Sequence, residues 1–337
     1  MQQLVFITGS TGLLGGHLLV HLYKNNFRIR ALIRTTSSFR QIRLICEFYG
    51  ISFDKLSESV EWVYGDTMDF VGLHEHLKDV DSVYHCAAMV SFSKKNREKL
   101  LSTNIRGTSN MVDASIACGV KKFCFISSIA ALGSEENNHL IDEDSFRDTN
   151  KKVSDYSESK YRSELEVWRG NAEGLNTIIL NPGVILGPGL PDKGSLLFFN
   201  VAKKGMPFYT DATTGYVDVR DISRAALELM AKGTYGKRFA VVSENIGNKQ
   251  LFSMIAAEFG KKGPSIRAGK GLLCIAAFIS GVYSQVTGKT PQFTKDTARS
   301  AKNPQQYSSK KIIDELNFKF TPISQTISET CDFLKRI

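Results

Sequence analysis

A chain of 337 residues, 42% of them hydrophobic, can bury a large core, and its 23% of charged residues excludes a fibrous or disordered class. The six cysteines form no CxxC pair and no zinc-type spacing with histidine, which argues against disulfides and metal and favours the reducing cytoplasm. The net charge of +9 fits a lysine-rich surface or attraction of a phosphorylated ligand, and no basic run interleaved with aromatics indicates nucleic-acid binding.

Strand-like and helix-like segments alternate through the first half of the chain. The alternation predicts right-handed crossovers and a parallel sheet, and the apolar runs FCFIS and TIIL are typical of strands buried on both faces. The predicted strands are 4–8, 28–33, 60–64, 82–86, 122–127 and 177–180. The predicted helices are 13–24, 73–77, 98–118 and 157–171.

The pattern changes after Pro182, where Gly, Pro and Asp become frequent. Further helices are predicted at 196–204, at 222–232 and through most of the chain after residue 250, and strands at 215–219 and 239–242. The apolar stretch 271–282 is too short to span a bilayer, so it predicts a buried helix or a wall of an apolar pocket, with contact to a membrane surface as the alternative.

These elements predict a Rossmann-type α/β fold with a doubly wound parallel sheet. We expect the dinucleotide-binding domain in residues 1–185, with 215–242 returning to it. A smaller, mostly helical C-terminal substrate lobe is expected from 186–214 and 243–337. The first strand begins a few residues after Met1 and leaves no room for a signal peptide.

A glycine-rich turn separates the first strand from the first helix. Its spacing, GxxGxxG, directs backbone N–H groups and the positive end of a helix at a phosphate. Gly9 permits the tight turn, Gly12 allows a pyrophosphate to approach, and Gly15 allows the helix to pack closely. The predicted phosphate-binding residues are Gly9, Ser10, Thr11, Gly12, Leu13, Leu14 and Gly15.

The residues after the next strands predict which dinucleotide binds. The second strand ends without an acidic residue for a ribose 2′-OH, and Arg34 can instead accept a 2′-phosphate. NADP (NADPH) is therefore preferred over NAD, unless Arg34 only begins a solvated loop. Asp66 and Thr67 suit the adenine, and the small segment Cys86-Ala87-Ala88 lets the cofactor lie against the backbone. Cys86 has no neighbour in sequence that would activate it as a nucleophile.

Tyr156 and Lys160 share one face at the start of a predicted helix because they are four residues apart. A phenol has a pKa of about 10, and a nearby ammonium should lower it, so that Tyr156 can exchange a proton with a carbonyl or alcohol oxygen. A hydroxyl after the fifth strand would hold the same oxygen. Ser127 and Ser128 both qualify, and Ser128, nearer the loop, is preferred.

Taken together, these segments resemble the extended short-chain dehydrogenases/reductases, a superfamily also called NAD-dependent epimerases/dehydratases. The matching segments are TGSTGLLG, GD at 65–66, HCAA at 85–88, NIRGT at 104–108, FISSIAALG at 125–133, YSESK at 156–160, NPGVILGPG at 181–189 and YVDVRD at 216–221. The resemblance implies that Ser128, Tyr156 and Lys160 are catalytic. It also implies a proton-relay and helix-geometry role for Asn104. Cofactor contacts are implied for Ser127, Tyr156, Lys160, Pro182, Gly183 and Val184.

Further residues resemble the dihydroflavonol-reductase-like branch of this superfamily. Leu132 stands where sugar-nucleotide epimerases usually carry Tyr, Asn181 where they carry Arg, and 308–318 resembles the tail of the reductases. This branch implies NADPH-dependent reduction of an aldehyde or ketone to an alcohol, on a moderately apolar substrate. The alternatives are an NAD-dependent sugar-nucleotide epimerase or dehydratase, and a non-catalytic NADP-binding protein.

The resemblance also implies where the substrate and a second copy of the chain would bind. Substrate contacts are expected from 89–92, 186–197, 208–209 and the C-terminal lobe. In this superfamily the helices corresponding to 98–118 and 157–171 commonly form a four-helix dimer contact. A homodimer is therefore expected, with no transmembrane segment, no metal and a cytoplasmic location.

Overall fold

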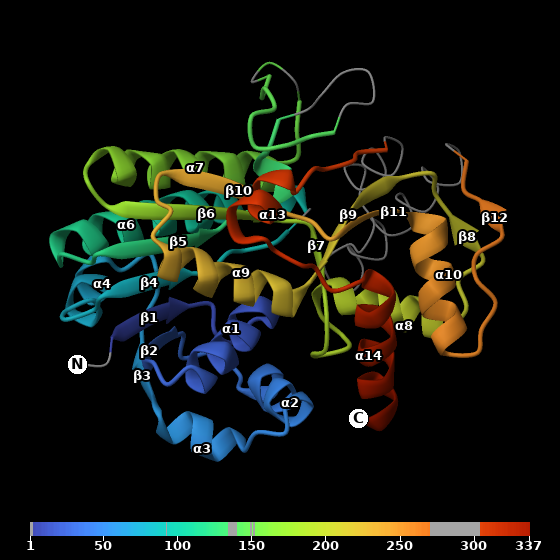
Figure 1. Cartoon of the computed structure of the whole chain (residues 1–337), viewed down its shortest axis with the longest axis horizontal. Coiled ribbons are helices and arrows are strands. Elements are labelled where there is room, and N and C mark those ends of the chain that lie inside the picture. The colour runs from blue at the N-terminus through green and yellow to red at the C-terminus, as the bar shows by residue number, and fades with distance from the viewer. Residues whose placement is uncertain (1–2, 92, 134–139, 149, 151, 270–303) are drawn as a thin grey trace.

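The protein is represented by a computed structural model that describes residues 3–91, 93–133, 140–148, 150, 152–269 and 304–337 (Figure 1). The apolar stretch 271–282 and residue 92 of the expected substrate contacts lie outside these residues. In the described part of the chain, no helix is both long enough and apolar enough to cross a membrane.

A seven-stranded parallel sheet forms the centre of the larger part of the molecule. Its strands are β1 (Leu4–Thr8), β2 (Arg28–Ile33), β3 (Val60–Tyr64), β4 (Ser82–His85), β5 (Lys122–Ile126), β6 (Asn176–Pro182) and β10 (Lys237–Val241). They lie in the order β10-β6-β5-β4-β1-β2-β3, and every neighbouring pair is parallel. The predicted doubly wound fold is confirmed, and the predicted strand at 239–242 is the edge strand β10.

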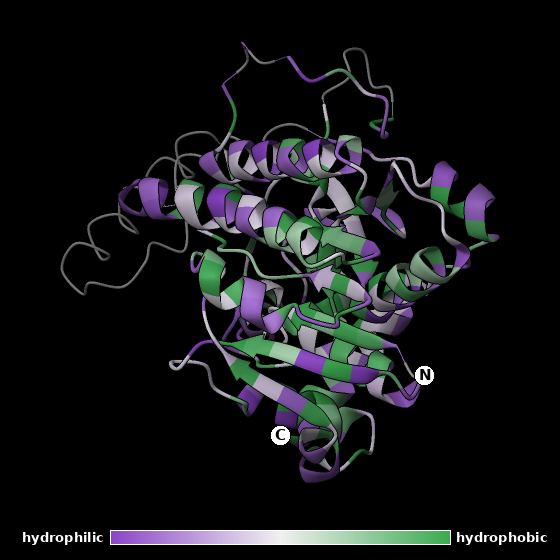
Figure 2. Cartoon of the chain, turned by 90° about the vertical axis from the view of Figure 1, so that its left-hand side faces the viewer, coloured by the Kyte–Doolittle hydropathy of each residue, from purple (hydrophilic) through white to green (hydrophobic). Residues whose placement is uncertain are grey.

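Helices cover both faces of this sheet (Figure 1). One face carries α1 (Leu13–Lys24), α2 (Arg40–Phe48), α3 (Phe53–Glu58) and α9 (Val219–Lys232), and the other carries α4 (Phe70–His76), α6 (Gly107–Ala117) and α7 (Asp155–Ala172). Alternate strand residues feed two separate cores: Ile7 packs with the first set of helices and Phe6 with the second. Figure 2 shows the resulting pattern, with hydrophobic strands between helices whose surfaces are partly hydrophilic.

Two parts of the sequence-based helix assignment are wrong. No helix was predicted between β2 and β3, where α2 and α3 lie; α2 buries Ile42, Ile45 and Cys46 on one face. The single helix predicted at 98–118 is divided into α5 (Arg97–Leu101), a π-helical turn η2 (Ser102–Arg106) and α6. The π turn forms where a backbone carbonyl binds side-chain hydroxyls, as described below.

A second, smaller sheet lies beside the first, in the order β11-β9-β7. Its strands are β7 (Val184–Leu186), β9 (Thr213–Asp218) and β11 (Glu244–Gly247), and it packs with α8 (Leu197–Lys203), α10 (Asn248–Glu258) and α14 (Ile323–Arg336) in a third core. The short strands β8 (Phe208–Tyr209) and β12 (Ile266–Arg267) pair with each other. Of the predicted return segment 215–242, α9 and β10 lie on the large sheet, whereas β9 belongs to the small one.

Short helical turns and one late helix complete the described elements. The turns are η1 (Lys94–Asn96), η3 (Ile129–Ala131) and η4 (Gly194–Leu196), and α13 (Lys310–Leu316) packs against β10. His17 of α1 joins the two parts of the molecule: its Nε2 lies 2.9 Å from the carbonyl oxygen of Pro188 and its Nδ1 lies 2.9 Å from the Tyr49 hydroxyl. Because a carbonyl only accepts, Nε2 carries the proton. Burial lowers the pKa of His17 to about 4.

Candidate active site

The order in which successive strands are added to the sheet reverses between β1 and β4. A doubly wound fold binds its ligand at this point. Here the turns after the two strands are in contact. Gly9 has φ +73°, and a Cβ on it would lie 2.7 Å from the Ala87 nitrogen. The Ala87 N–H donates to Thr8 Oγ1 at 3.1 Å, and Thr8 Oγ1 lies 2.7 Å from His85 Nδ1. The predicted phosphate-binding turn and the predicted segment 86–88 are therefore brought together.

The start of α1 is open to an anion. No side chain in the described residues caps this helix, and its first turn, which begins at Leu13 and Leu14, holds no acidic residue. Ser10 Oγ, just before the helix, is buried and has no hydrogen-bond partner in the same part of the chain. A Cβ on Gly15 would overlap the Gly9 carbonyl oxygen, so the helix packs directly on the turn. Free donors and a bare backbone fit the pyrophosphate of a dinucleotide.

A cavity of about 460 Å³ lies at the carboxyl ends of β2 and β3. It is lined by Arg34, Thr35, Thr36, Tyr64, Gly65 and Asp66. Arg34 is exposed, and its backbone N–H donates to Ser37 Oγ at 3.1 Å, which fixes the start of the loop. The cavity therefore brings Arg34 and Asp66 together, the two residues predicted to bind the ribose and the adenine.

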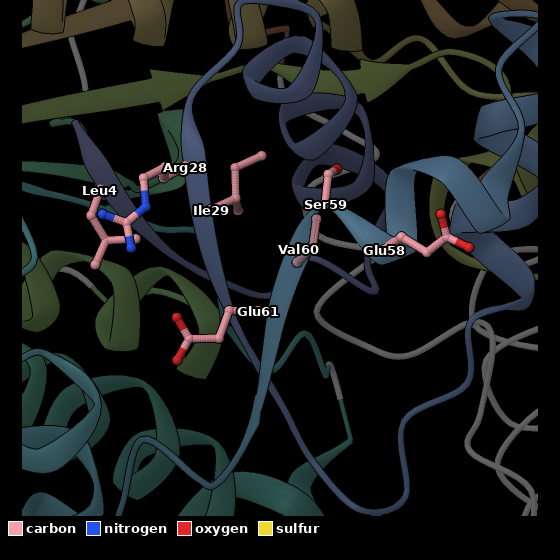
Figure 3. Close-up of a pocket in the computed structure, with 7 residues that line it drawn as sticks. All are labelled: Leu4, Arg28, Ile29, Glu58, Ser59, Val60 and Glu61. Atoms are coloured by element: carbon pink, nitrogen blue, oxygen red, sulfur yellow. The ribbon is translucent and has the colours of Figure 1, made fainter. Parts of the chain in front are cut away.

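A second cavity, of about 290 Å³, lies at the opposite edge of the sheet (Figure 3). Its lining comes from the amino ends of β1, β2 and β3 and from the end of α3: Leu4, Arg28, Ile29, Glu58, Ser59, Val60 and Glu61. Ligands of open α/β sheets bind outside the carboxyl ends of the strands. The edge that carries Arg34 and the glycine turn is therefore the candidate cofactor site.

The predicted catalytic hydroxyls meet just beyond the end of β5. Ser128 is in extended backbone and its Oγ accepts the Ala130 N–H at 3.1 Å, which caps the short turn η3. Tyr156 lies in the first turn of α7, after the capping residue Ser154. The side chains of Tyr156 and Ser128 are hydrogen-bonded to each other. The sequence-based preference for Ser128 over Ser127 thus has a geometric basis.

Lys160 is buried on the next turn of α7 and faces β5. Its Nζ donates to the Ile126 carbonyl oxygen at 2.7 Å and lies 4.4 Å from the centre of the Phe125 ring. Burial lowers the pKa of Lys160 to about 8, against the opposing charges of Glu164 and Cys86. Burial also raises the pKa of Cys86 to about 12, which agrees with its interpretation as a packing residue.

The predicted effect of Lys160 on Tyr156 is wrong for this arrangement. Burial raises the pKa of Tyr156 above its usual value, and the hydrogen bond to Ser128 acts in the opposite direction. The Lys160 ammonium donates to the Ile126 carbonyl on β5, and the Tyr156 pKa does not fall as the sequence suggested. The phenol consequently keeps its proton throughout the neutral pH range.

Asn104 connects the loop after β4 with the catalytic helix. Its Oδ1 accepts the Met89 N–H at 2.7 Å, and its Nδ2 donates to the Met89 carbonyl and to Ser159 Oγ, both at 3.0 Å. Its backbone carbonyl accepts hydrogen bonds from the hydroxyls of Thr108 and Ser163. Asn104 lies in the π turn η2, so these bonds start from the point at which the predicted helix is interrupted.

Glu164 was missed by the sequence analysis although it lies inside the catalytic corner. Its carboxylate accepts hydrogen bonds from the Ser127 hydroxyl and from Asn181 Nδ2 (2.6 Å), and it pairs with Arg238 Nη1 at 3.1 Å. The spacing Tyr156-x3-Lys160-x3-Glu164 was an available signal, since it places all three on one helix face. The Ser127 hydroxyl donates to Glu164, and the Ser127 N–H donates to the Leu180 carbonyl at 2.7 Å.

The remaining predicted cofactor residues lie at the same edge of the sheet. Asp66 Oδ1 accepts the Met68 N–H at 3.0 Å, and the Thr67 carbonyl accepts a hydrogen bond from Asn110. Pro182 ends β6, and the N–H of Gly183 donates to the Val241 carbonyl at 3.0 Å before β7 begins at Val184. The segment 182–184 therefore leads from the large sheet to the small one.

Comparisons with known proteins agree with this geometry. The model of the NAD dependent epimerase/dehydratase family matches residues 5–242. A Synechocystis sp. protein that carries the name dihydroflavonol 4-reductase is 25% identical over 335 residues, 98% of this chain and 94% of the relative. Cinnamoyl-CoA reductase 1 of Petunia hybrida is 22% identical over 343 residues, 99% of this chain and 92% of the relative. The structure of UDP-glucose 4-epimerase from Thermotoga maritima has a TM-score of 0.76 and 18% identity over 99% of both chains, a likeness of fold alone.

The doubly wound sheet, the open glycine turn and the Ser-Tyr-Lys corner define a dinucleotide-dependent α/β enzyme. The chain belongs to the NAD-dependent epimerase/dehydratase family. It is an extended short-chain dehydrogenase/reductase of the dihydroflavonol-reductase-like branch and an NAD(P)-dependent oxidoreductase, as its motifs predicted.

Proposed function

We propose that this protein uses NADPH to reduce an aldehyde or ketone of a moderately apolar substrate to the alcohol. The observation that carries the proposal is the hydrogen bond between Tyr156 and Ser128 beside the buried Lys160. A phenol that remains protonated at neutral pH suits the direction of reduction, in which it must supply a proton. The names of the reductase relatives support the same direction.

The side chains divide the reaction between them. NADPH, when bound, supplies a hydride to the carbonyl carbon. Ser128 donates a hydrogen bond that orients the carbonyl oxygen, and Tyr156 transfers its proton to that oxygen as the carbon–oxygen double bond becomes single. Lys160, one turn further along α7, would hold the ribose. Asn104 positions this turn of α7 through its hydrogen bond to Ser159.

The preference for NADP over NAD is proposed from the cavity at the ends of β2 and β3. Its lining contains Arg34, whose guanidinium can bind a 2′-phosphate with two parallel hydrogen bonds. Asp66, the acidic residue of this lining, follows β3 rather than β2, where a carboxylate for a ribose 2′-OH would stand.

We also propose that the protein forms a homodimer through α6 and α7. These helices pack side by side, and Leu165 of α7 is 47% exposed, which leaves apolar surface for a partner. The measurement is the mass in solution by light scattering. A single species with the mass of one chain would exclude this dimer.

Purified protein mixed with NADPH and separate pools of aldehydes, ketones and nucleotide sugars tests the proposed reaction. We expect loss of NADPH absorbance that depends on a carbonyl compound and is faster than the loss of NADH. An isomerised or dehydrated sugar without net NADPH loss, together with tightly retained NAD, would instead identify a sugar-nucleotide epimerase or dehydratase. Normal NADPH binding without turnover of any compound would identify a non-catalytic binding protein.

A further inference from the structure

Glu164 is a buried residue with a carboxyl side chain, and it has no role in the reaction proposed above. Its residue is 1% exposed, and an isolated buried carboxylate is strongly unfavourable unless it is paired and hydrogen-bonded. Its partners come from the ends of three strands: Ser127 after β5, Asn181 in β6 and Arg238 in β10. One side chain of the catalytic helix thus binds the large sheet at three points.

Each of these bonds leads to a group of the catalytic corner. Ser127 directly precedes Ser128, and Asn181 Nδ2, besides binding Glu164, donates to the Ser128 carbonyl oxygen at 3.0 Å. Lys160 lies one turn before Glu164 on α7, and its Nζ is fixed on Ile126, the residue before Ser127. A displacement of Glu164 would therefore shift Ser128 relative to Tyr156.

The charges around Lys160 point to the same side chain. The titratable groups that face Lys160 are His85 and Cys86 at the end of β4 and Glu164 on its own helix. His85 is buried, and its pKa is lowered to about 3, first by burial and then by the Lys160 charge, so it is neutral. Arg238 adds a second cation beyond Glu164 and is held there by the Glu143 carbonyl. Among the residues that the structure describes, Glu164 is therefore the carboxyl group that faces Lys160.

We propose that Glu164 is a positioning residue of this enzyme: it fixes α7, one turn after Lys160, against the strand ends that carry Ser128. The proposal rests on the proposed reduction, because it assigns Glu164 a role in the same Ser-Tyr-Lys corner. It goes beyond that reaction because the steps given above assign Glu164 no role. Two substitutions separate the effect of the length of the Glu164 side chain from the effect of its charge.

Glu164→Gln keeps the size of the side chain and removes its charge, whereas Glu164→Asp keeps the charge and shortens the side chain. Without the carboxylate, Lys160 loses its proton more readily. We therefore expect the alkaline fall of kcat/KM to lie about one pH unit lower in Glu164→Gln than in the unchanged protein. In Glu164→Asp the fall should stay in place while kcat drops about tenfold, because Ser128 is displaced.

Two further variants keep the test decisive. Glu166→Gln removes a half-buried carboxylate from the same helix, where it pairs with Arg169, and should change neither the pH profile nor kcat. Arg238→Gln removes the cation on the other side of Glu164 and should leave the alkaline fall unchanged or move it to higher pH. If Glu164→Gln does not fold, the Glu164→Asp and Arg238→Gln profiles carry the test.

NADPH binding, followed by its fluorescence against pH, separates failure of this proposal from failure of the proposed reaction. If the unchanged protein reduces no carbonyl compound, the proposed reaction is wrong. The pH at which NADPH affinity falls should still be about one unit lower in Glu164→Gln. A folded Glu164→Gln protein with the unchanged protein's pH dependence of turnover and binding would overturn the positioning role.

Discussion

The glycine turn after β1 and the catalytic corner beyond β5 lie on the same edge of one sheet but are built from different parts of the chain. The turn is made of backbone: Gly9 in a left-handed conformation, Gly15 in contact with Gly9, and a helix start without a capping side chain. The corner is made of buried side chains, with Lys160 and Glu164 among them. The turn requires residues that have no side chain, whereas the corner requires particular polar side chains.

This difference predicts two kinds of failure. An added methyl group should damage the turn through steric overlap and leave the chemistry of the corner unchanged. Removal of the Tyr156 hydroxyl should damage the chemistry of the corner and leave cofactor binding nearly unchanged. The following variants test this contrast.

The largest effect is expected for Tyr156→Phe. It removes the proton donor but keeps the ring, and the loss of a general acid lowers turnover by about 10²–10⁴-fold. NADPH affinity, measured by fluorescence titration, should stay within a factor of about three, since the turn is unchanged. Turnover equal to that of the unchanged protein would refute the assignment of Tyr156 as donor.

Gly15→Ala should have the next largest effect. A Cβ at this position overlaps the backbone of Gly9, which cannot rotate away. We expect a loss of about 3 kcal/mol of unfolding free energy, because overpacking forces the backbone to shift. NADPH binding should weaken by at least tenfold. Chemical denaturation measures the first quantity and fluorescence titration the second.

Gly269→Ala is the matched control for this variant, because a Cβ there meets no atom of the described residues within 4 Å and the residue does not have a positive φ. It should change neither stability nor binding. Equal stability of the two variants would show that the close approach of α1 to the turn is not required.

The buried His17 predicts how the free energy of unfolding changes at acid pH. Its pKa is about 4 in the folded protein and about 6.5 when unfolded, so the unfolded chain takes up the proton first as the pH falls. Stability is complete above pH 6.5 and decreases toward pH 4, by about 2 kcal/mol at pH 4.5 from this residue. His17→Gln keeps a donor for Pro188 and should flatten this part of the profile, measured by urea unfolding at pH 7 and 4.5. If the stability of His17→Gln falls as much between pH 7 and 4.5 as that of the unchanged protein, other groups cause the loss of stability.

The smallest effect is expected for Arg34→Ala. If the guanidinium binds a 2′-phosphate, its removal should lower kcat/KM for NADPH about tenfold, since a hydrogen bond to a charged group contributes roughly 1.5–3 kcal/mol. The value for NADH should not change. Arg28→Ala, in the cavity at the opposite edge of the sheet, is the control and should affect neither cofactor (Figure 3). Equal losses for both cofactors would remove the argument for NADP.

The strands and the glycine turn could be predicted because their signals are local. Apolar runs mark the strands of a parallel sheet, and the order of glycines marks the start of α1. The pattern of α2 was also local, with Ile42, Ile45 and Cys46 at helical spacing, and it could have been recognised. The catalytic and cofactor roles remain predictions, but the structure brings Tyr156 and Ser128 into contact.

The π turn and the Glu164 cluster depend on contacts between distant residues, which no local pattern contains. Asn104 binds Ser159 and Ser163, more than 50 residues away along the chain, and this contact interrupts the helix. The pairing of Glu164 with Arg238 exists only because β10 adds to the edge of the sheet beside β6. The Tyr156 pKa was misjudged for the same reason, since the position of the Lys160 ammonium on Ile126 is set by the fold.

The ion pair between Glu164 and Arg238 also sets an order of events during synthesis of the chain. The two residues are 74 positions apart, so at about 5–20 residues per second Arg238 is added roughly 4–15 s after Glu164. During this interval the nucleotide-binding strands β1 to β5 can already pair, whereas the carboxylate still lacks its cation and stays in water. The glycine turn can therefore form early on the ribosome, whereas the Glu164–Arg238 ion pair forms only when β10 joins the sheet.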